Sequence, residues 1–114
     1  MRRDESSLLD IAEAARLVLA FTRDVTKVSF LDDLKTQSAV LHQLLVVGEA
    51  VKRLSREFRA QHPAIPWLLI AGMRDHLIHA YDTVDLDEVW KTATRDVPEL
   101  LAAIEPLLPK KSSE

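Results

Sequence analysis

The chain has 114 residues, of which 47% are hydrophobic and 29% charged, a mixture typical of one folded domain. It has no cysteine, which excludes a disulfide framework, a thiol nucleophile and a cysteine-ligated zinc site, and it has no apolar run of the roughly 18 residues that a membrane-spanning helix needs. The net charge of −3 argues against a protein that coats nucleic acid, and because the charged N-terminus is unlike a secretory signal we expect a cytoplasmic protein.

The first predicted element is a helix over about residues 4–24, where apolar positions recur at steps of three and four. They form one stripe, which consists of Leu8, Ile11, Ala15, Val18, Thr22 and Val25. The chain has only two glycines, whereas β-hairpins and sandwiches need many turn glycines. The pattern therefore predicts an all-helical protein.

The second predicted helix starts after an N-cap at Asp32 or Asp33 and runs for about 25 residues, to Phe58. Its apolar stripe consists of Val40, Leu44, Val47, Val51, Leu54 and Phe58. Gly48 lies in the middle of this helix, where glycine costs about 1 kcal/mol relative to alanine. We therefore expect another helix to approach closely at Gly48.

Two prolines in the segment 62–66 end the second helix, and Pro66 suits the first turn of a third. The third helix carries Trp67, Ile70, Met73, Leu77 and Ala80. After a break at 82–85, Asp85 is the expected N-cap of a fourth helix. Pro98 either kinks that helix or opens a short fifth one.

These elements predict an up-down bundle of four or five helices, with one helical domain over residues 1–108 and a disordered tail over 109–114. Adjacent apolar residues at 44–47 and 68–70 make the apolar faces wider than a single core requires. Such a surplus indicates a subunit interface, most simply in a two-fold dimer.

Candidate chemistry gathers in the segment 72–81, at the end of the third helix. It contains Arg74, Asp75, His76, His79 and Tyr81. Asp75 and His79 are four residues apart, so the carboxylate can orient the imidazole and favour its protonated form. Arg74 and His79 are five residues apart, roughly 140° around a regular helix. They can contact one ligand only if the long arginine side chain extends around the helix, the helix is irregular near His79, or a partner subunit completes the site. We favour the partner subunit.

An arginine and a histidine are sufficient to cut RNA without a metal. The guanidinium of Arg74 would bind phosphate oxygens and stabilise the charge that grows on them in the transition state. The imidazole of His79 would take the proton from a ribose 2′-hydroxyl or give one to the leaving 5′-oxygen. Such a site needs a few good contacts, so an acidic protein can carry it.

Other interpretations of these residues remain open. Arg74 and His79 can be surface or interface residues without a chemical role. His76 and His79, with Asp75 as a third ligand, can hold a metal ion. Neither interpretation is excluded by the spacing.

Glu49 has two candidate partners. It lies four residues before Arg53, which suits a surface ion pair on one helix. It also follows Gly48, so it can reach Arg74 across the expected helix contact. His42 and His62 have no partner that the sequence identifies.

Arg74, His79 and Tyr81 form an R-x4-H-x-Y pattern that resembles the signature of the HEPN superfamily, specifically the HepT-like ribonuclease toxins. The likeness extends to the segments 47–55, 62–67, 70–75 and 84–90. The resemblance implies an α-helical bundle that dimerises so that two signature segments face each other across a cleft. It implies a metal-independent endoribonuclease without a cofactor, acting as the toxin of a toxin–antitoxin pair.

The resemblance also assigns roles to individual residues. Arg74 and His79 would be catalytic, and Asp75 would support them. Tyr81 would accept AMP from ATP, transferred by an MNT-type nucleotidyltransferase antitoxin. The expected partners are RNA, that antitoxin and a second copy of the chain, with no membrane or DNA. The alternatives are a non-catalytic HEPN module that binds a nucleotide or docks the nucleotidyltransferase, and a plain helical dimerisation domain.

Overall fold

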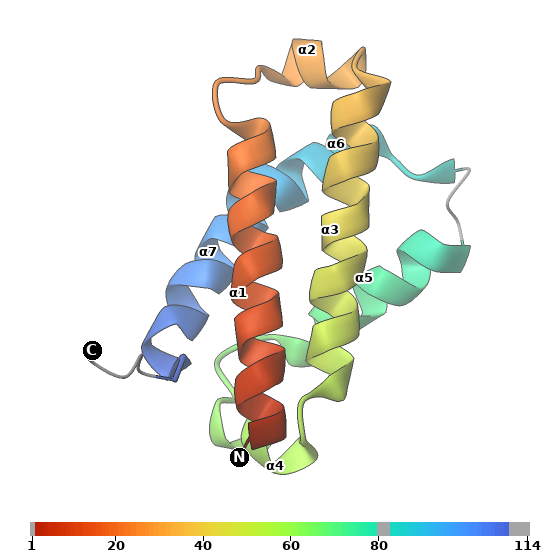
Figure 1. Ribbon diagram of the computed structural model, residues 1–114. Coiled ribbons are helices and arrows are strands. Elements are labelled where there is room, and N and C mark those ends of the chain that lie inside the picture. The colour runs from red at the N-terminus through yellow and green to blue at the C-terminus, as the bar shows by residue number, and fades with distance from the viewer. Residues whose placement is uncertain (1, 80–82, 110–114) are drawn as a thin grey trace.

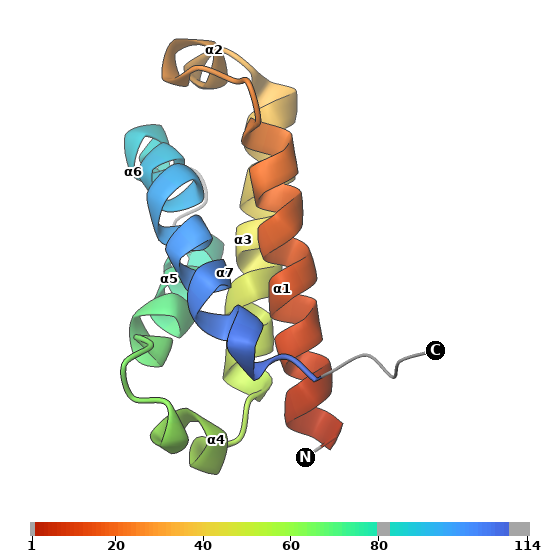
Figure 2. The ribbon, with the colours of Figure 1, turned by 90° about the vertical axis from the view of Figure 1, so that its left-hand side faces the viewer.

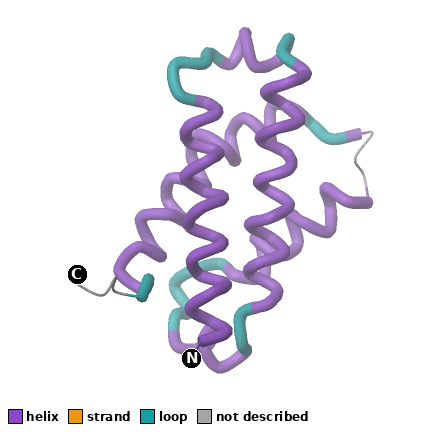
Figure 3. Tube along the Cα trace, viewed as in Figure 1, coloured by secondary structure: helices purple, strands orange, loops and turns teal. Residues whose placement is uncertain are grey.

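The computed structural model describes the chain at residues 2–79 and 83–109, with the backbone alone at Arg2, Ile78 and His79. Within these ranges every regular element is helical, which confirms the all-α prediction (Figures 1 and 3). The two longest helices, α1 (Arg2–Thr22) and α3 (Leu34–Arg53), pack side by side and run in opposite directions. The short helix α2 (Lys27–Leu31) crosses between them at one end.

The second half of the chain forms a layer behind this pair (Figure 2). It consists of α4 (Arg56–Gln61), α5 (Trp67–His79), α6 (Leu86–Lys91), a π-helical turn (Thr92–Asp96), α7 (Val97–Ile104) and a 3-10 turn (Glu105–Leu107). Helix α5 packs on α3, and α7 packs on α1. The 20 Å thickness of the molecule, against a length of 42 Å, matches two layers of helices.

The core lies between the two layers and follows the predicted stripes. Leu8, Ile11 and Val18 of α1 are fully buried, as are Val40 and Val51 of α3. Both helices therefore bury the faces that the apolar spacing indicates. Among the described helices, none is long and apolar enough to cross a membrane.

The second predicted helix is two helices in the structure, so the prediction of one helix to Phe58 was wrong. Helix α3 begins after the N-cap Asp33, as predicted, but ends at Arg53, and Ser55 caps the separate helix α4. The cause is a contact from α1. The buried carboxylate of Asp4 accepts the backbone N–H and the hydroxyl of Ser55, both at 2.7 Å. The Ser55 N–H is thereby withdrawn from the helical pattern.

Helix α2 is an element that the sequence analysis did not predict. The hydroxyl of Thr26 caps it, accepting from the Ser29 N–H at 3.1 Å. Phe30 is fully buried, and its ring centre lies 5.1 Å from that of Trp90. The Gln37 amide donates to the Phe30 carbonyl at 2.9 Å. Long-range contacts therefore stabilise this helix. It could not be predicted, because five residues are too few to show a periodic apolar pattern.

Pro98 lies in the first turn of a short helix, α7, so the second of the two predicted alternatives is confirmed. Asp85 caps α6 as predicted, with its carboxylate accepting the Asp87 N–H at 2.9 Å. The helix then continues through the π-helical turn directly into α7, and the Val97 N–H bonds to the Thr92 carbonyl. The widened turn accommodates a proline that has no N–H to donate.

The two segments with surplus apolar residues differ in the structure. Leu44 and Val47 are buried in the core, so most of the first segment is explained within one chain. Leu68 and Leu69, in contrast, are 79% and 77% exposed at the start of α5. The predicted dimer and the domain limits at 108 and 109 stay predictions.

Candidate functional site

The candidate site lies where α5 crosses α3, at Gly48. A Cβ atom at this glycine would lie 2.2 Å from the Cβ of Arg74 and 3.2 Å from its Cα. Real Cβ atoms do not approach one another so closely. The predicted close approach at Gly48 is therefore confirmed, and the residue that approaches is the signature arginine.

Arg74 is held by one carboxylate from each helix. Its Nη2 lies 2.9 Å from Oε1 of Glu49 on α3, and its Nη1 lies 3.0 Å from Oδ1 of Asp75 on α5. The arginine side chain is 26% exposed, so part of the guanidinium reaches the surface. Two separate anchors on a planar group fix both its position and its orientation.

Lys52 joins Arg74, Glu49 and Asp75 in a charge network across the two helices, as far as the described side chains show. Its Nζ donates to the same Oδ1 of Asp75 at 3.0 Å. The hydrogen bond from Lys52 and then that from Arg74 lower the pKa of Asp75, despite some desolvation. Asp75 is therefore a stable carboxylate, and the two anions balance the two cations.

The structure decides between the two predicted partners of Glu49. The ion pair with Arg53 was wrong, because Arg53 turns toward α1 and pairs with Asp10 at 3.2 Å. The contact with Arg74 is confirmed. Lys52 was not predicted as part of the site, although it lies four residues after Gly48 and thus on the same face of α3.

The other half of the predicted site falls largely outside the described residues. His79 is the last residue of α5, and its side chain is not described; Tyr81 lies outside the described ranges. The contacts of His79 with Arg74 and Asp75 therefore stay predictions, as does a metal site with His76. Among the described side chains, no three metal-ligating groups gather.

The other histidines whose side chains are described are His42, His62 and His76. His62 packs its ring 4.7 Å from that of Phe58, and its carbonyl accepts the Trp67 Nε1–H at 3.0 Å, which closes the proline loop. His42 of α3 and His76 of α5 are exposed. His62 therefore has a structural role in the turn between α4 and α5.

The arrangement suits the binding of a phosphate. A guanidinium has five N–H donors, and the two carboxylates of the network leave some of them free for a ligand.

Residues 11–107 match the family described as Ribonuclease HepT-like. The chain belongs to the HepT-like ribonuclease family. The resemblance that the R-x4-H-x-Y pattern indicated is thereby confirmed.

Several proteins resemble this HepT-like chain over nearly its whole length. The "Probable ribonuclease HepT" of Thermococcus cleftensis is 46% identical over 108 residues, which cover 94% of this chain and 98% of that protein. "Putative RNase MJ0127" of Methanocaldococcus jannaschii is 40% identical over 89% of this chain and 84% of its own. "Putative RNase TTE0752" of Caldanaerobacter subterraneus is 33% identical over 97% and 99%. A comparison with solved structures found no match.

Proposed function

We propose that this protein is a metal-independent endoribonuclease in which Arg74 and His79 cleave RNA. The observation that carries the proposal is the Arg74 guanidinium, which Glu49 and Asp75 hold at a partly exposed helix crossing. Membership of the HepT-like ribonuclease family and the names of the relatives support the same activity.

Each of the two groups has one task in the reaction. His79 removes the proton from a ribose 2′-hydroxyl, whose oxygen forms a bond to the adjacent phosphorus while the bond from phosphorus to the 5′-oxygen breaks. The leaving oxygen takes up a proton, and the phosphate is left as a cyclic ester. Arg74 binds the non-bridging oxygens and stabilises their growing charge. Because the network already orients Arg74, little reorganisation accompanies the reaction.

The proposed active form is a two-fold dimer. Five positions on a helix place Arg74 and His79 roughly 140° apart, so Arg74 would meet His79 of the partner subunit. A mixture of the Arg74→Ala and His79→Ala proteins tests this arrangement. Exchange of subunits creates one intact composite site in each mixed dimer, so activity returns. Activity that stays absent in verified mixed dimers would place both groups within one subunit.

The central experiment is cleavage of single-stranded RNA in excess EDTA. We expect the wild-type protein to cut, and Arg74→Ala and His79→Ala each to lower the rate at least about 100-fold. His76→Ala is the matched control, because it removes an exposed imidazole from the same helix. Circular dichroism and light scattering verify that folding and assembly are unchanged. Full cleavage by both alanine variants, or loss of wild-type cleavage in EDTA, contradicts the proposal.

The proposed cellular role is that of a toxin silenced by a nucleotidyltransferase antitoxin. Tyr81 lies seven residues after Arg74, and AMP on its hydroxyl would add negative charge and bulk where RNA phosphate binds. Mass spectrometry after co-expression with an MNT-type nucleotidyltransferase tests this step. We expect AMP on Tyr81 of the wild-type protein and none on Tyr81→Phe. An unmodified Tyr81 in a complex that still blocks growth arrest refutes adenylylation.

A non-catalytic module is the second candidate function. The charge network favours it in one respect, because Glu49 and Asp75 neutralise Arg74 and Lys52. Such a module binds a nucleotide or the nucleotidyltransferase without cutting RNA. Saturable binding of ATP by a dimer that cleaves no RNA would support it over the nuclease.

A further inference from the structure

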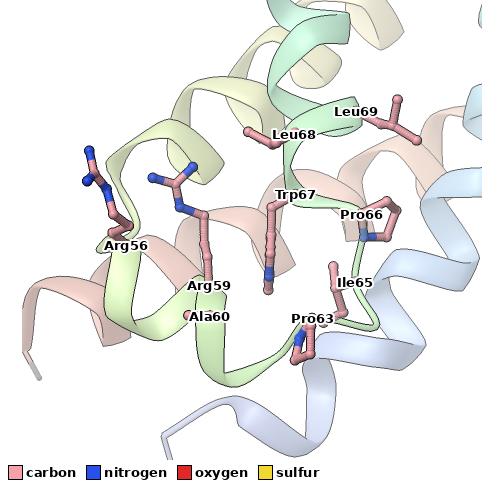
Figure 4. A pocket seen from close by; sticks show the side chains of 9 residues that line it. All are labelled: Arg56, Arg59, Ala60, Pro63, Ile65, Pro66, Trp67, Leu68 and Leu69. Carbon is pink, nitrogen blue, oxygen red and sulfur yellow. The ribbon is translucent and has the colours of Figure 1, made fainter.

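A cavity of about 610 Å³ lies between α4 and the start of α5 (Figure 4). Arg56 and Arg59 of α4 line one side of it, and Trp67 and Leu68 of α5 line another. The two arginines are three residues apart on a helix, so they lie on the same face. In Figure 4 the side chains of Arg56 and Arg59 extend from α4 in much the same direction.

The two arginines have no anionic partner in the part of the chain that the structure describes. Four other arginines each form an ion pair: Arg16, Arg53, Arg74 and Arg95. The Nε atom of Arg59 is also buried without a hydrogen-bond partner. Two unneutralised guanidinium groups at one cavity are an anion-binding arrangement.

The cavity lies about two helical turns along α5 from the candidate catalytic arginine. Trp67 and Arg74 are seven residues apart, so they share one face of α5 at a separation of roughly 10.5 Å along its axis. Trp67 packs on α4, with its ring centre 6.2 Å from that of Phe58, and Arg74 packs on α3. Lys52 lies on the last turn of α3, immediately before α4. The cavity and the charge network therefore lie at two successive positions along α5, each beside basic residues of α3 or α4.

We infer that the Arg56–Arg59 cavity binds the RNA strand next to the cleaved linkage, with the arginines on a phosphate. This inference rests on the proposed nuclease function and names a substrate-binding site for it. Leu68, which is 79% exposed, offers apolar surface to the adjoining base or ribose. A guanidinium plane is a stacking surface for an unpaired base. The Trp67 indole is not, because it is 5% exposed and donates its N–H to His62.

Charge favours RNA over a second copy of the chain as the occupant. A two-fold contact centred on this cavity would bring the arginines of both copies together, and like charges repel. A polyanion neutralises both guanidinium groups at once. The overall net charge of −3 makes a local cationic site necessary if an RNA strand is to be held in register.

The test measures RNA binding without cleavage, in the full chain carrying His79→Ala. Fluorescence anisotropy with a labelled single-stranded RNA compares Arg56→Gln/Arg59→Gln with Arg23→Gln. The control removes a charge of the same kind just after α1, at the far end of the helix pair. We expect a Kd at least about fivefold higher for the double variant and a salt slope lower by about 0.7 for each phosphate that the arginines no longer neutralise. An affinity and slope equal to those of the control overturn the inference.

Further readouts separate this inference from the nuclease proposal. The single variant Arg56→Gln changes an exposed residue and keeps the test valid if Arg59→Gln does not fold. In the nuclease with His79 intact, the double variant should raise KM several-fold more than it changes kcat. If the double variant cleaves RNA with unaltered affinity and KM, the RNA-binding role of the cavity is refuted and the nuclease proposal is not. If RNA binding depends on the two arginines but the wild-type protein cleaves no RNA, the nuclease proposal is refuted and the binding site is not. Altered assembly or antitoxin binding, with unaltered RNA affinity, assigns the cavity to a protein partner and refutes it as an RNA site.

Discussion

Gly48 and Arg74 are in contact at the crossing of α3 and α5, so closely that a Cβ at position 48 would lie 2.2 Å from the Arg74 Cβ. The atoms concerned are at the base of the arginine side chain, next to its backbone. No rotation of the arginine relieves the collision, so α5 itself would have to move. The absence of a side chain at 48 therefore sets the distance between the helices that carry Glu49 and Arg74.

We predict that Gly48→Ala destabilises the protein and lowers cleavage. Alanine would stabilise the isolated helix by about 1 kcal/mol, but overpacking at a helix crossing costs roughly 1–3 kcal/mol and displaces α5. Urea denaturation should show a lower free energy of unfolding, and the remaining folded protein should cut RNA more slowly because Arg74 is displaced from Glu49.

Gly72→Ala is the matched control for this prediction. Gly72 lies in the same helix as Arg74, and a Cβ there would meet nothing within 4 Å. We expect this variant to be more stable than the wild type by up to about 1 kcal/mol, through helix propensity alone. Equal effects of the two glycine substitutions would show that the crossing does not control stability.

We predict that Glu49→Gln lowers kcat more than it lowers stability. The substitution keeps the shape of the side chain but removes the charge that holds Nη2 of Arg74 at 2.9 Å. A displacement of about 1 Å in a catalytic group can cost about 100-fold in rate. Single-turnover cleavage measures the effect, and Glu13→Gln, an exposed glutamate of α1, is the control. A variant that loses stability but cuts normally would make Glu49 a structural residue only.

We predict that the contact between Asp4 and Ser55 makes stability depend on pH in the acid range. Burial by itself raises the pKa of Asp4, but the hydrogen bonds from Ser55 outweigh it, and the folded pKa lies below the ordinary 3.8. The stabilisation is therefore complete above pH 3.8 and is lost as pH falls through the lower folded value. Asp4→Asn should cost about 2 kcal/mol at neutral pH.

Denaturation at a series of pH values measures this difference. The gap between wild type and Asp4→Asn should shrink only below pH 3.8. Asp10→Asn is the control, because the pair of Asp10 with Arg53 is exposed and worth well under about 1 kcal/mol. A constant gap across the acid range would mean that the carboxylate charge of Asp4 does not hold Ser55.

The long helices could be predicted from sequence because each carries its own information. The apolar stripes of α1 and α3 recur at the helical period, and Asp33 and Asp85 are capping residues that act within a few residues. The break at Ser55 and the short helix α2 could not be predicted. Asp4 causes the first from 51 residues away, and Trp90 packs on the second.

The candidate site divides in the same way. The segment around Arg74 is dense in polar residues, and Gly48 is an unfavourable residue in a helix. Both could therefore be singled out from the sequence alone. The choice between Arg53 and Arg74 as the partner of Glu49 depends on how α3 and α5 cross. The bond from Lys52 to Asp75 depends on the same crossing, which no spacing along one helix reveals.

We predict that the dependence of cleavage on pH near neutrality comes from His79 and not from Asp75. The hydrogen bonds from Lys52 and Arg74 hold the pKa of Asp75 below 3.8, so this carboxylate stays ionised throughout that range, whereas an imidazole titrates near about 6.5. In Asp75→Asn the near-neutral limb of the kcat profile should therefore survive. Its midpoint should fall to lower pH, because the protonated imidazole loses an anionic neighbour one turn away. Asp10→Asn, which removes a carboxylate from α1, should leave the midpoint unchanged. A limb that vanishes in Asp75→Asn would make Asp75 the titrating group, and an unmoved midpoint would show that Asp75 and His79 do not interact.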